Sequence, residues 1–167
     1  MPIRGIVRVT AGALCLLGVL ARPGQAQRHP INVALVTPIQ IFPAPDTVQG
    51  FRLNLIYGRN EAMTGFDLGL ANHVAGRMKG LQLGVVNMSG SAVGLQWGLG
   101  NFNEGDFEGV QVGWFNQAGR INGLQLAFVN YAKRANGLQI GLVNIIKKGG
   151  QFPVMIIANW GSDKQEE

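Results

Sequence analysis

The chain has 167 residues, of which 47% are apolar and only 14% are charged, so a mainly disordered chain is excluded and one domain is expected. Glycine occupies 25 positions, about twice its usual share of roughly 7%, and each glycine inside a helix costs about 1 kcal/mol. A mainly helical protein is therefore excluded. The formal charge is +5, and the single cysteine excludes an internal disulfide framework and a cysteine-rich zinc site.

Residues 1–26 have the pattern of a secretory signal peptide. Arg4 and Arg8 precede an uncharged, largely apolar run of 13 residues at positions 9–21, which is shorter than the roughly 20 residues that a membrane-spanning helix needs. Gly24 and Ala26 supply the small residues that precede a cleavage site. We therefore expect export, with Gln27 as the first residue of the mature chain.

Cleavage after residue 26 would change the charge of the protein. Three arginines and no acidic residue would be lost, which leaves eleven basic against nine acidic side chains. A surplus of two charges gives little support to nucleic-acid binding. Cys15 would be lost with the leader, and a chain without cysteine suits the oxidising periplasm or cell surface.

A glycine-led repeat occupies most of the remaining chain. Each copy has the frame Gly-Leu-Gln-Leu-Gly-Val-Val-Asn or a close variant, and a degenerate copy at Gly50 precedes six clear ones. The leading glycines advance by 15, 15, 14, 15, 14 and 14 residues and are Gly50, Gly65, Gly80, Gly94, Gly109, Gly123 and Gly137. A period this short and regular predicts tandem structural repeats.

Within each copy the residues one, three and five places after the glycine are apolar, and this alternation predicts β-strands. We expect the bulky residues to face the core, including Trp97, Trp114 and the residues Leu83, Val112, Leu126 and Ile140. The face that carries the glutamines is expected to be thin and partly polar. A second, shorter strand should enter the core through the residues two places before the glycine, which are Met78, Ala92, Phe107, Ile121 and Ala135.

Asparagine closes each copy, and we expect its tolerance of left-handed backbone to shape a corner there. The asparagines are Asn72, Asn87, Asn101, Asn116, Asn130 and Asn144. In a β-solenoid each repeat is one coil, so equivalent residues stack about 4.8 Å apart. In an antiparallel meander, or a small outer-membrane-type β-barrel, each repeat is one strand and equivalent residues lie apart. The fixed Gln and Asn favour the all-β solenoid, with the antiparallel forms as the alternative.

The expected organisation has four parts. Residues 1–26 form the signal peptide, 27–49 an N-terminal capping segment and linker, 50–160 the repeat β domain, and 161–167 a disordered polar tail. Pro43 and Pro45 indicate the linker, and the apolar strand that follows Pro153 closes the repeats.

The repeated Gly-Leu-Gln-Leu/Ile-Gly-Leu/Val-Val-Asn motif, followed by Ile-Ile-Lys-Lys-Gly-Gly at residues 145–150, resembles the bacterial surface-repeat proteins first named from leptospires. The resemblance covers roughly residues 50–160. It implies an exported protein of the cell envelope and carries no established catalytic residue. The chain departs from the motif at Arg52 and Asp67, where glutamine is expected.

The sequence predicts no catalytic, cofactor-binding or metal-binding residue. His29 and His73 are the two histidines, and neither has a second metal ligand at a suitable spacing. Alternation would place Glu104, Asp106 and Glu108 on one side of a strand, where they could gather calcium, but a solvated acidic loop is the expectation.

Four basic residues suggest a small basic edge, because Lys133 and Arg134 precede Lys147 and Lys148 by one repeat. Such an edge could touch anionic lipid or polysaccharide, although charged ends commonly only discourage aggregation. We expect the latter role.

These observations together predict an exported, non-catalytic envelope protein that acts as a scaffold or interaction surface, in the periplasm, in the outer membrane or on the cell surface. Its partner would be an envelope protein, a polysaccharide or the membrane surface, without nucleic acid or a cofactor. The alternatives are a small outer-membrane β-barrel and a carbohydrate-active enzyme on a β-solenoid. The enzyme is disfavoured because the strand positions offer a single carboxylate, Asp67.

Overall fold

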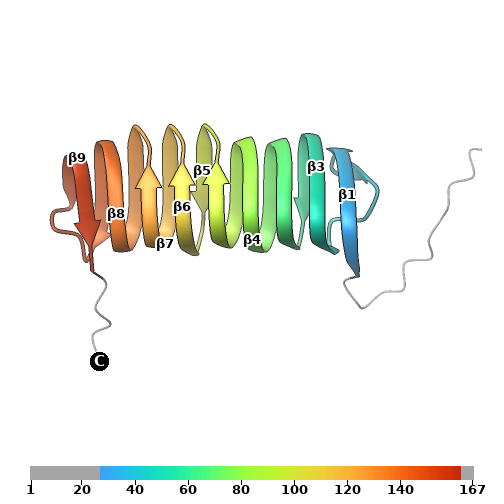
Figure 1. The fold of residues 1–167 in the computed structure, drawn as a ribbon, viewed down its shortest axis with the longest axis horizontal. Helices are drawn as coiled ribbons and strands as arrows, with labels where there is room; N and C mark the ends of the chain where they lie inside the picture. Colours follow the sequence, from blue (N-terminus) through green and yellow to red (C-terminus); the bar gives the residue numbers. More distant parts are fainter. Residues whose placement is uncertain (1–26, 163–167) are drawn as a thin grey trace, which may run out of the picture.

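A computed structural model describes residues 27–162, and the predicted signal peptide and residues 163–167 of the predicted tail lie outside the described residues. The described chain is a β-solenoid of about seven coils (Figure 1). The coils lie side by side along the long axis, with β1 at one end and β9 at the other. Among residues 27–162 no helix is long and apolar enough to cross a bilayer.

Nine strands form one continuous sheet that winds around the solenoid axis. The longest strand has 36 residues and bends through successive coils rather than running straight. In chain order the strands are β1 (Arg28–Val36), β2 (Ile39–Gln40), β3 (Thr47–Asn60), β4 (Ala62–Trp97), β5 (Gly100–Asn103), β6 (Asp106–Val112), β7 (Phe115–Leu126), β8 (Val129–Lys148) and β9 (Val154–Gly161).

Neighbouring coils pair in parallel and in register. Between β6 and β7, for example, Gly109 lies opposite Gly123 and Gln111 opposite Gln125. The same pairing of leading glycines continues between β7 and β8. The solenoid prediction is therefore confirmed, and the antiparallel alternative is excluded by the direction of the strands.

The leading glycine of each coil is required by its backbone and by its neighbour. Gly94 has a φ of 129°, which residues with a side chain rarely adopt, and a Cβ placed on it would lie 2.0 Å from the carbonyl oxygen of Gly80. All seven leading glycines have positive φ. The repeat therefore begins with glycine because two backbones meet there without room for a side chain.

The two faces of the strands are reversed relative to the expectation. Gln82 and Gln111 are fully buried, whereas Ile140 is exposed and Leu83, Val112 and Leu126 are only partly covered. The prediction that the bulky residues form the core is therefore wrong. Stacking supplies the physical reason, because a side-chain amide that bonds to an identical amide in the next coil no longer carries the cost of an unsatisfied buried group.

The apolar part of the core comes from the part of each coil between the closing asparagine and the next leading glycine. The prediction that the residues two places before each glycine enter the core is confirmed, since all five have at most 3% of their surface exposed. They join other buried apolar residues in one cluster that runs along the solenoid: Val48, Met63, Val74, Met78, Ala92, Phe107, Ala118, Ile121, Ala132, Ala135 and Ile146.

The asparagines close the coils, but not through left-handed backbone. Among the described residues other than glycine, Ile157 alone has a positive φ. The expected left-handed corner is therefore wrong, and the asparagine is explained by its side-chain bonds, which are described below.

Each end of the solenoid carries an antiparallel strand, the two-residue β2 beside β1 at the N-terminal end and β9 beside β8 at the C-terminal end. The stack begins before the first repeat, because β1 pairs in parallel with β3, and Ile31 and Val33 lie opposite Phe51 and Leu53. At the other end β9 pairs with β8 in the antiparallel direction. Gly161, assigned from the sequence to the tail, is the last residue of β9.

Candidate functional site

A glutamine ladder runs through the interior along the solenoid axis. In each step the side-chain Nε2 donates to the Oε1 of the glutamine in the preceding coil, as between Gln125 and Gln111 at 2.7 Å. The donor–acceptor distances in the ladder lie between 2.6 and 2.9 Å. The ladder comprises Gln82, Gln96, Gln111, Gln125 and Gln139, all of them buried.

An asparagine ladder runs beside it at the corner of the coils. From the first member to Asn130, each Nδ2 donates to the Oδ1 of the next coil, at 2.8 Å from Asn101 to Asn116. From Asn72 onward the same Nδ2 also donates to a backbone carbonyl, that of Val112 for Asn101. The predicted stacking of the asparagines is confirmed. The ladder comprises Asn54, Asn72, Asn87, Asn101, Asn116, Asn130 and Asn144.

The two ladders point in opposite directions, because the glutamines donate toward the N-terminal end and the asparagines toward the C-terminal end. Each ladder therefore finishes with an acceptor that lacks a donor. Asn54 Oδ1 is left without a hydrogen bond at one end and Gln139 Oε1 at the other. The interior polar groups are otherwise largely satisfied, so these ladders are structural rather than a site for a ligand.

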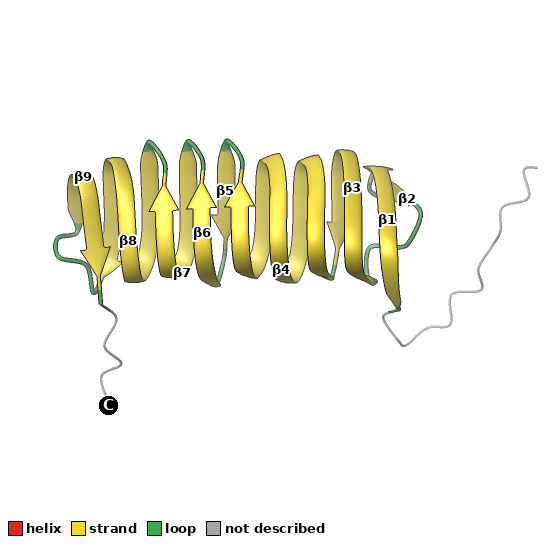
Figure 2. Ribbon diagram, in the orientation of Figure 1, coloured by secondary structure: helices red, strands yellow, loops and turns green. Residues whose placement is uncertain are grey.

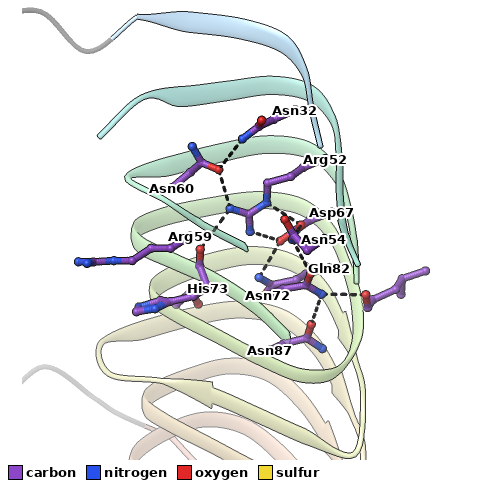
Figure 3. A network of polar contacts seen from close by, with 12 residues as sticks. Asn32, Arg52, Asn54, Arg59, Asn60, Asp67, Asn72, His73, Gln82 and Asn87 are labelled. Carbon is purple, nitrogen blue, oxygen red and sulfur yellow. Dashed lines mark hydrogen bonds and ion pairs between the residues drawn. The ribbon is translucent and has the colours of Figure 1, made fainter. Parts of the chain in front are cut away.

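The two departures from the glutamine motif form a buried ion pair (Figure 3). Arg52 donates from Nε to Oδ1 of Asp67 at 2.8 Å and from Nη2 to Oδ2 at 2.6 Å, and both side chains are fully buried. Asp67 also accepts the last bond of the glutamine ladder, from Gln82 at 3.0 Å. The pair thus occupies two places of the same column and ends the ladder with an ion pair.

The outer surface of the coils carries an unusual feature, which we call the apolar ridge. It consists of the side chains three and five places after each leading glycine, and every one of them is apolar. They are Leu53, Leu68, Leu83, Trp97, Val112, Leu126 and Ile140 in the first column and Leu55, Leu70, Val85, Leu99, Trp114, Phe128 and Leu142 in the second.

The ridge follows one long edge of the solenoid, where the chain turns from one wall to the other. The loops at 98–99, 113–114 and 127–128 lie along this edge (Figure 2). Its second column is the more exposed, from 43% for Val85 to 65% for Leu142. Trp97 and Trp114, which the sequence placed in the core, are 61% and 62% exposed on the ridge.

Two shallow apolar hollows lie along the ridge. One has a volume of about 680 Å³ and lies between the side chains of Val85, Trp97 and Trp114, and the other has about 510 Å³ and lies beside Phe128 and Leu142. Both are lined by a glycine that follows the first column, such as Gly113, whose Cβ position faces the backbone of the neighbouring coil and the asparagine ladder rather than the hollow. The hollows are open apolar surface rather than an enclosed active site.

A polar cleft of about 290 Å³ lies on a wall of the solenoid, away from the ridge. Its lining includes Arg77, Asp106, Glu108 and Arg120. The predicted acidic loop is divided, because Glu104 follows β5 while the other two acids lie on β6. Within residues 27–162 no group of three or more acidic, histidine or cysteine side chains is placed to hold a metal ion.

The two histidines each have a local partner. His29 Nε2 lies 2.9 Å from Oδ2 of Asp46, and its ring stacks on Phe42. His73 Nδ1 lies 2.7 Å from the hydroxyl of Tyr57. Burial lowers the pKa of His73, and the positive charges of Arg59 and Arg52 lower it further. Each ring thus has one polar side-chain partner, Asp46 for His29 and Tyr57 for His73.

The predicted basic residues are on the outer surface. Lys133, Arg134, Lys147 and Lys148 are all exposed, and Arg134 lies opposite Arg120 in the neighbouring coil. From residue 109 to residue 162 the chain has five basic side chains and no acidic one. The C-terminal coils therefore present a positively charged surface.

The ridge was not predicted as a surface, because the bulky residues of the strands were expected to face the core. The signal that could have identified the inner face is the recurrence of Gln two places after the leading glycine in five repeats and of Asn seven places after it in six, since amide ladders need identical neighbours. No family model, curated protein or solved structure matches the chain.

Proposed function

We propose that the protein is exported to the bacterial envelope and acts there as a rigid, non-catalytic scaffold that binds another envelope component through its apolar ridge. The observation that carries the proposal is the ridge itself, fourteen outward side chains without one polar residue. Contiguous exposed apolar surface of this extent is typical of interaction sites. The glutamine and asparagine ladders inside the coils supply the rigidity.

Three further observations support the proposal. Residues 1–26 have the pattern of a signal peptide, and the remaining chain has no cysteine. The repeat motif resembles that of bacterial surface-repeat proteins. Asp67, the carboxylate that an enzyme on this scaffold would use, is fully buried against Arg52 and therefore does not face a substrate.

Fractionation of expressing cells tests this proposal. We expect the protein in the envelope fraction, with Gln27 as its first residue by mass spectrometry. A ridge variant, Leu142→Asp, should move to the soluble fraction, whereas the exposed control Asn136→Asp, with the same change of charge, should stay. An intact Met1 on a cytosolic protein, or equal retention of both variants, would contradict the proposal.

A further inference from the structure

We infer that the apolar ridge inserts into the surface of a lipid bilayer that contains anionic phospholipid. This inference rests on the proposed function and names the partner. The shape of the ridge, the hydrogen bonds of its backbone and the distribution of charge around it each support lipid over a protein surface.

The ridge is convex, because it lies on the edge where each coil turns from one wall to the other (Figure 2). All seven residues of its second column are exposed, including Trp114 and Phe128 at the turns. Two such edges touch along a line, whereas a stable protein interface buries about 800 Å² on each partner. A fluid bilayer surrounds a convex edge and covers both of its sides.

The backbone under the ridge is already hydrogen-bonded, which contact with hydrocarbon requires. The amide of Trp114 donates to the carbonyl of Leu99 at 2.9 Å, and that of Val129 donates to the carbonyl of Trp114 at 3.0 Å. The amide of Val143 continues the series, with a bond of 2.9 Å to the carbonyl of Phe128. The turns thus present side chains to lipid without leaving these amide groups unpaired.

Charge and aromatic residues favour the interface of an anionic bilayer. Lys133 and Lys147 each lie five residues after the second apolar column, and Arg134 lies six residues before the first, which corresponds to about 16–20 Å of extended chain. An edge that enters a bilayer by about 5–10 Å would leave these groups about 10 Å above the headgroups, and their positive charge, with no acidic side chain between residues 109 and 162, attracts an anionic surface over about that distance. Trp97 and Trp114 belong to the residue type enriched at the depth of the headgroups.

Flotation of the purified protein with vesicles tests the inference. The protein is taken as the cell processes it, and all variants share one N-terminus, so any contribution of residues 1–26 cancels. We expect binding to vesicles of equal parts phosphatidylcholine and phosphatidylglycerol, and weaker binding to phosphatidylcholine alone. Phe128→Asp and Leu142→Asp should each weaken binding at least about tenfold, and Asn136→Asp should weaken it far less.

A second measurement, quenching of tryptophan fluorescence, locates the ridge in the bilayer. Phospholipids with brominated acyl chains should quench the tryptophan fluorescence, and Trp114→Phe should remove much of that quenching. Far-ultraviolet circular dichroism checks that each variant keeps its strands, which we expect because the altered side chains are exposed.

The inference is overturned if the wild-type protein binds neither vesicle, or if the ridge variants bind as the control does. A dimer that the ridge variants dissociate, without any binding to vesicles, would assign the ridge to a second copy instead. Loss of envelope retention in cells without vesicle binding would leave the proposed function standing and reject lipid. Vesicle binding by a protein that cells do not export would leave lipid binding standing and reject the proposed function.

Discussion

The ion pair that ends the glutamine ladder can be replaced by the motif from which it departs. Arg52→Gln and Asp67→Gln together would restore glutamine in two successive places of one column, where Gln82 already donates to the position of Asp67. Each single change instead leaves a fully buried charge without its partner, because both side chains are inaccessible to water.

The expected magnitudes follow from the hydrogen bonds. Breaking a buried ion pair costs about 3–5 kcal/mol, so additive effects of the two changes would reach about 6–10 kcal/mol. In the double variant the new amides can bond along the ladder, and the main losses are the bonds from Arg52 to Asn60 and to the carbonyl of His73, at about 1 kcal/mol each. We expect the double variant to lose about 1–3 kcal/mol, which gives a coupling of at least about 3 kcal/mol.

Urea denaturation followed by circular dichroism measures this cycle. A single variant that does not fold still informs the test, because the double variant should then recover folding. If the double variant is as unstable as the sum of the single ones, the ladder does not accept glutamine at these places and the reasoning fails. Glu61→Gln, an exposed change of charge in the same coil, is the control and should have little effect.

Three further predictions concern the repeat and the histidine. Asn116→Val and Asn116→Gly should both lower the free energy of unfolding by about 3 kcal/mol or more, because each removes the hydrogen bonds to Asn101 and Asn130. Glycine has no advantage over valine from left-handed backbone, since the φ of Asn116 is not positive, and a much milder effect of glycine in chemical denaturation would contradict this. Gly94→Ala should lower the melting temperature far more than Gly105→Ala, whose Cβ would meet its nearest atom at 2.9 Å, and equal shifts would refute the steric argument. The lowered pKa of His73 means that the folded state binds its proton less readily than the unfolded state, so stability should fall as pH drops through about 6.5. His73→Gln should reduce the fall in denaturant midpoint between pH 7 and pH 5, and an unchanged fall would contradict the assignment.

The period of the leading glycines and the fixed Gln and Asn were sufficient to predict a parallel stack and the entry of residues such as Phe107 into the core. The inner face could not be predicted in the same way, because alternation places Gln111 and Val112 on opposite sides without saying which side is inside. Transfer free energies favour burying valine when each residue is considered alone. In a stack the amide of Gln111 has partners in both neighbouring coils, and that cooperative term is absent from any single repeat.

Arg52 and Asp67 illustrate a second limit. In the sequence each is a separate departure from the motif, fifteen residues from the other. One period of the repeat is also one step along the column, so two departures of opposite charge at that spacing predict a contact between neighbouring coils. That inference requires the stack to be known first, and it was therefore available only after the choice between parallel and antiparallel strands.

The reversed direction of β9 has a consequence for the length of the particle. A stack of equal parallel coils has translational symmetry, so the edge it presents at one end matches the edge at the other and molecules could join head to tail into a filament. An antiparallel strand at the C-terminal end breaks this match, because a parallel coil of a second molecule would no longer meet the pattern of donors and acceptors found between β7 and β8. The number of repeats in the sequence therefore sets the length of a finite rod. The length of its apolar edge is fixed by the gene rather than by assembly.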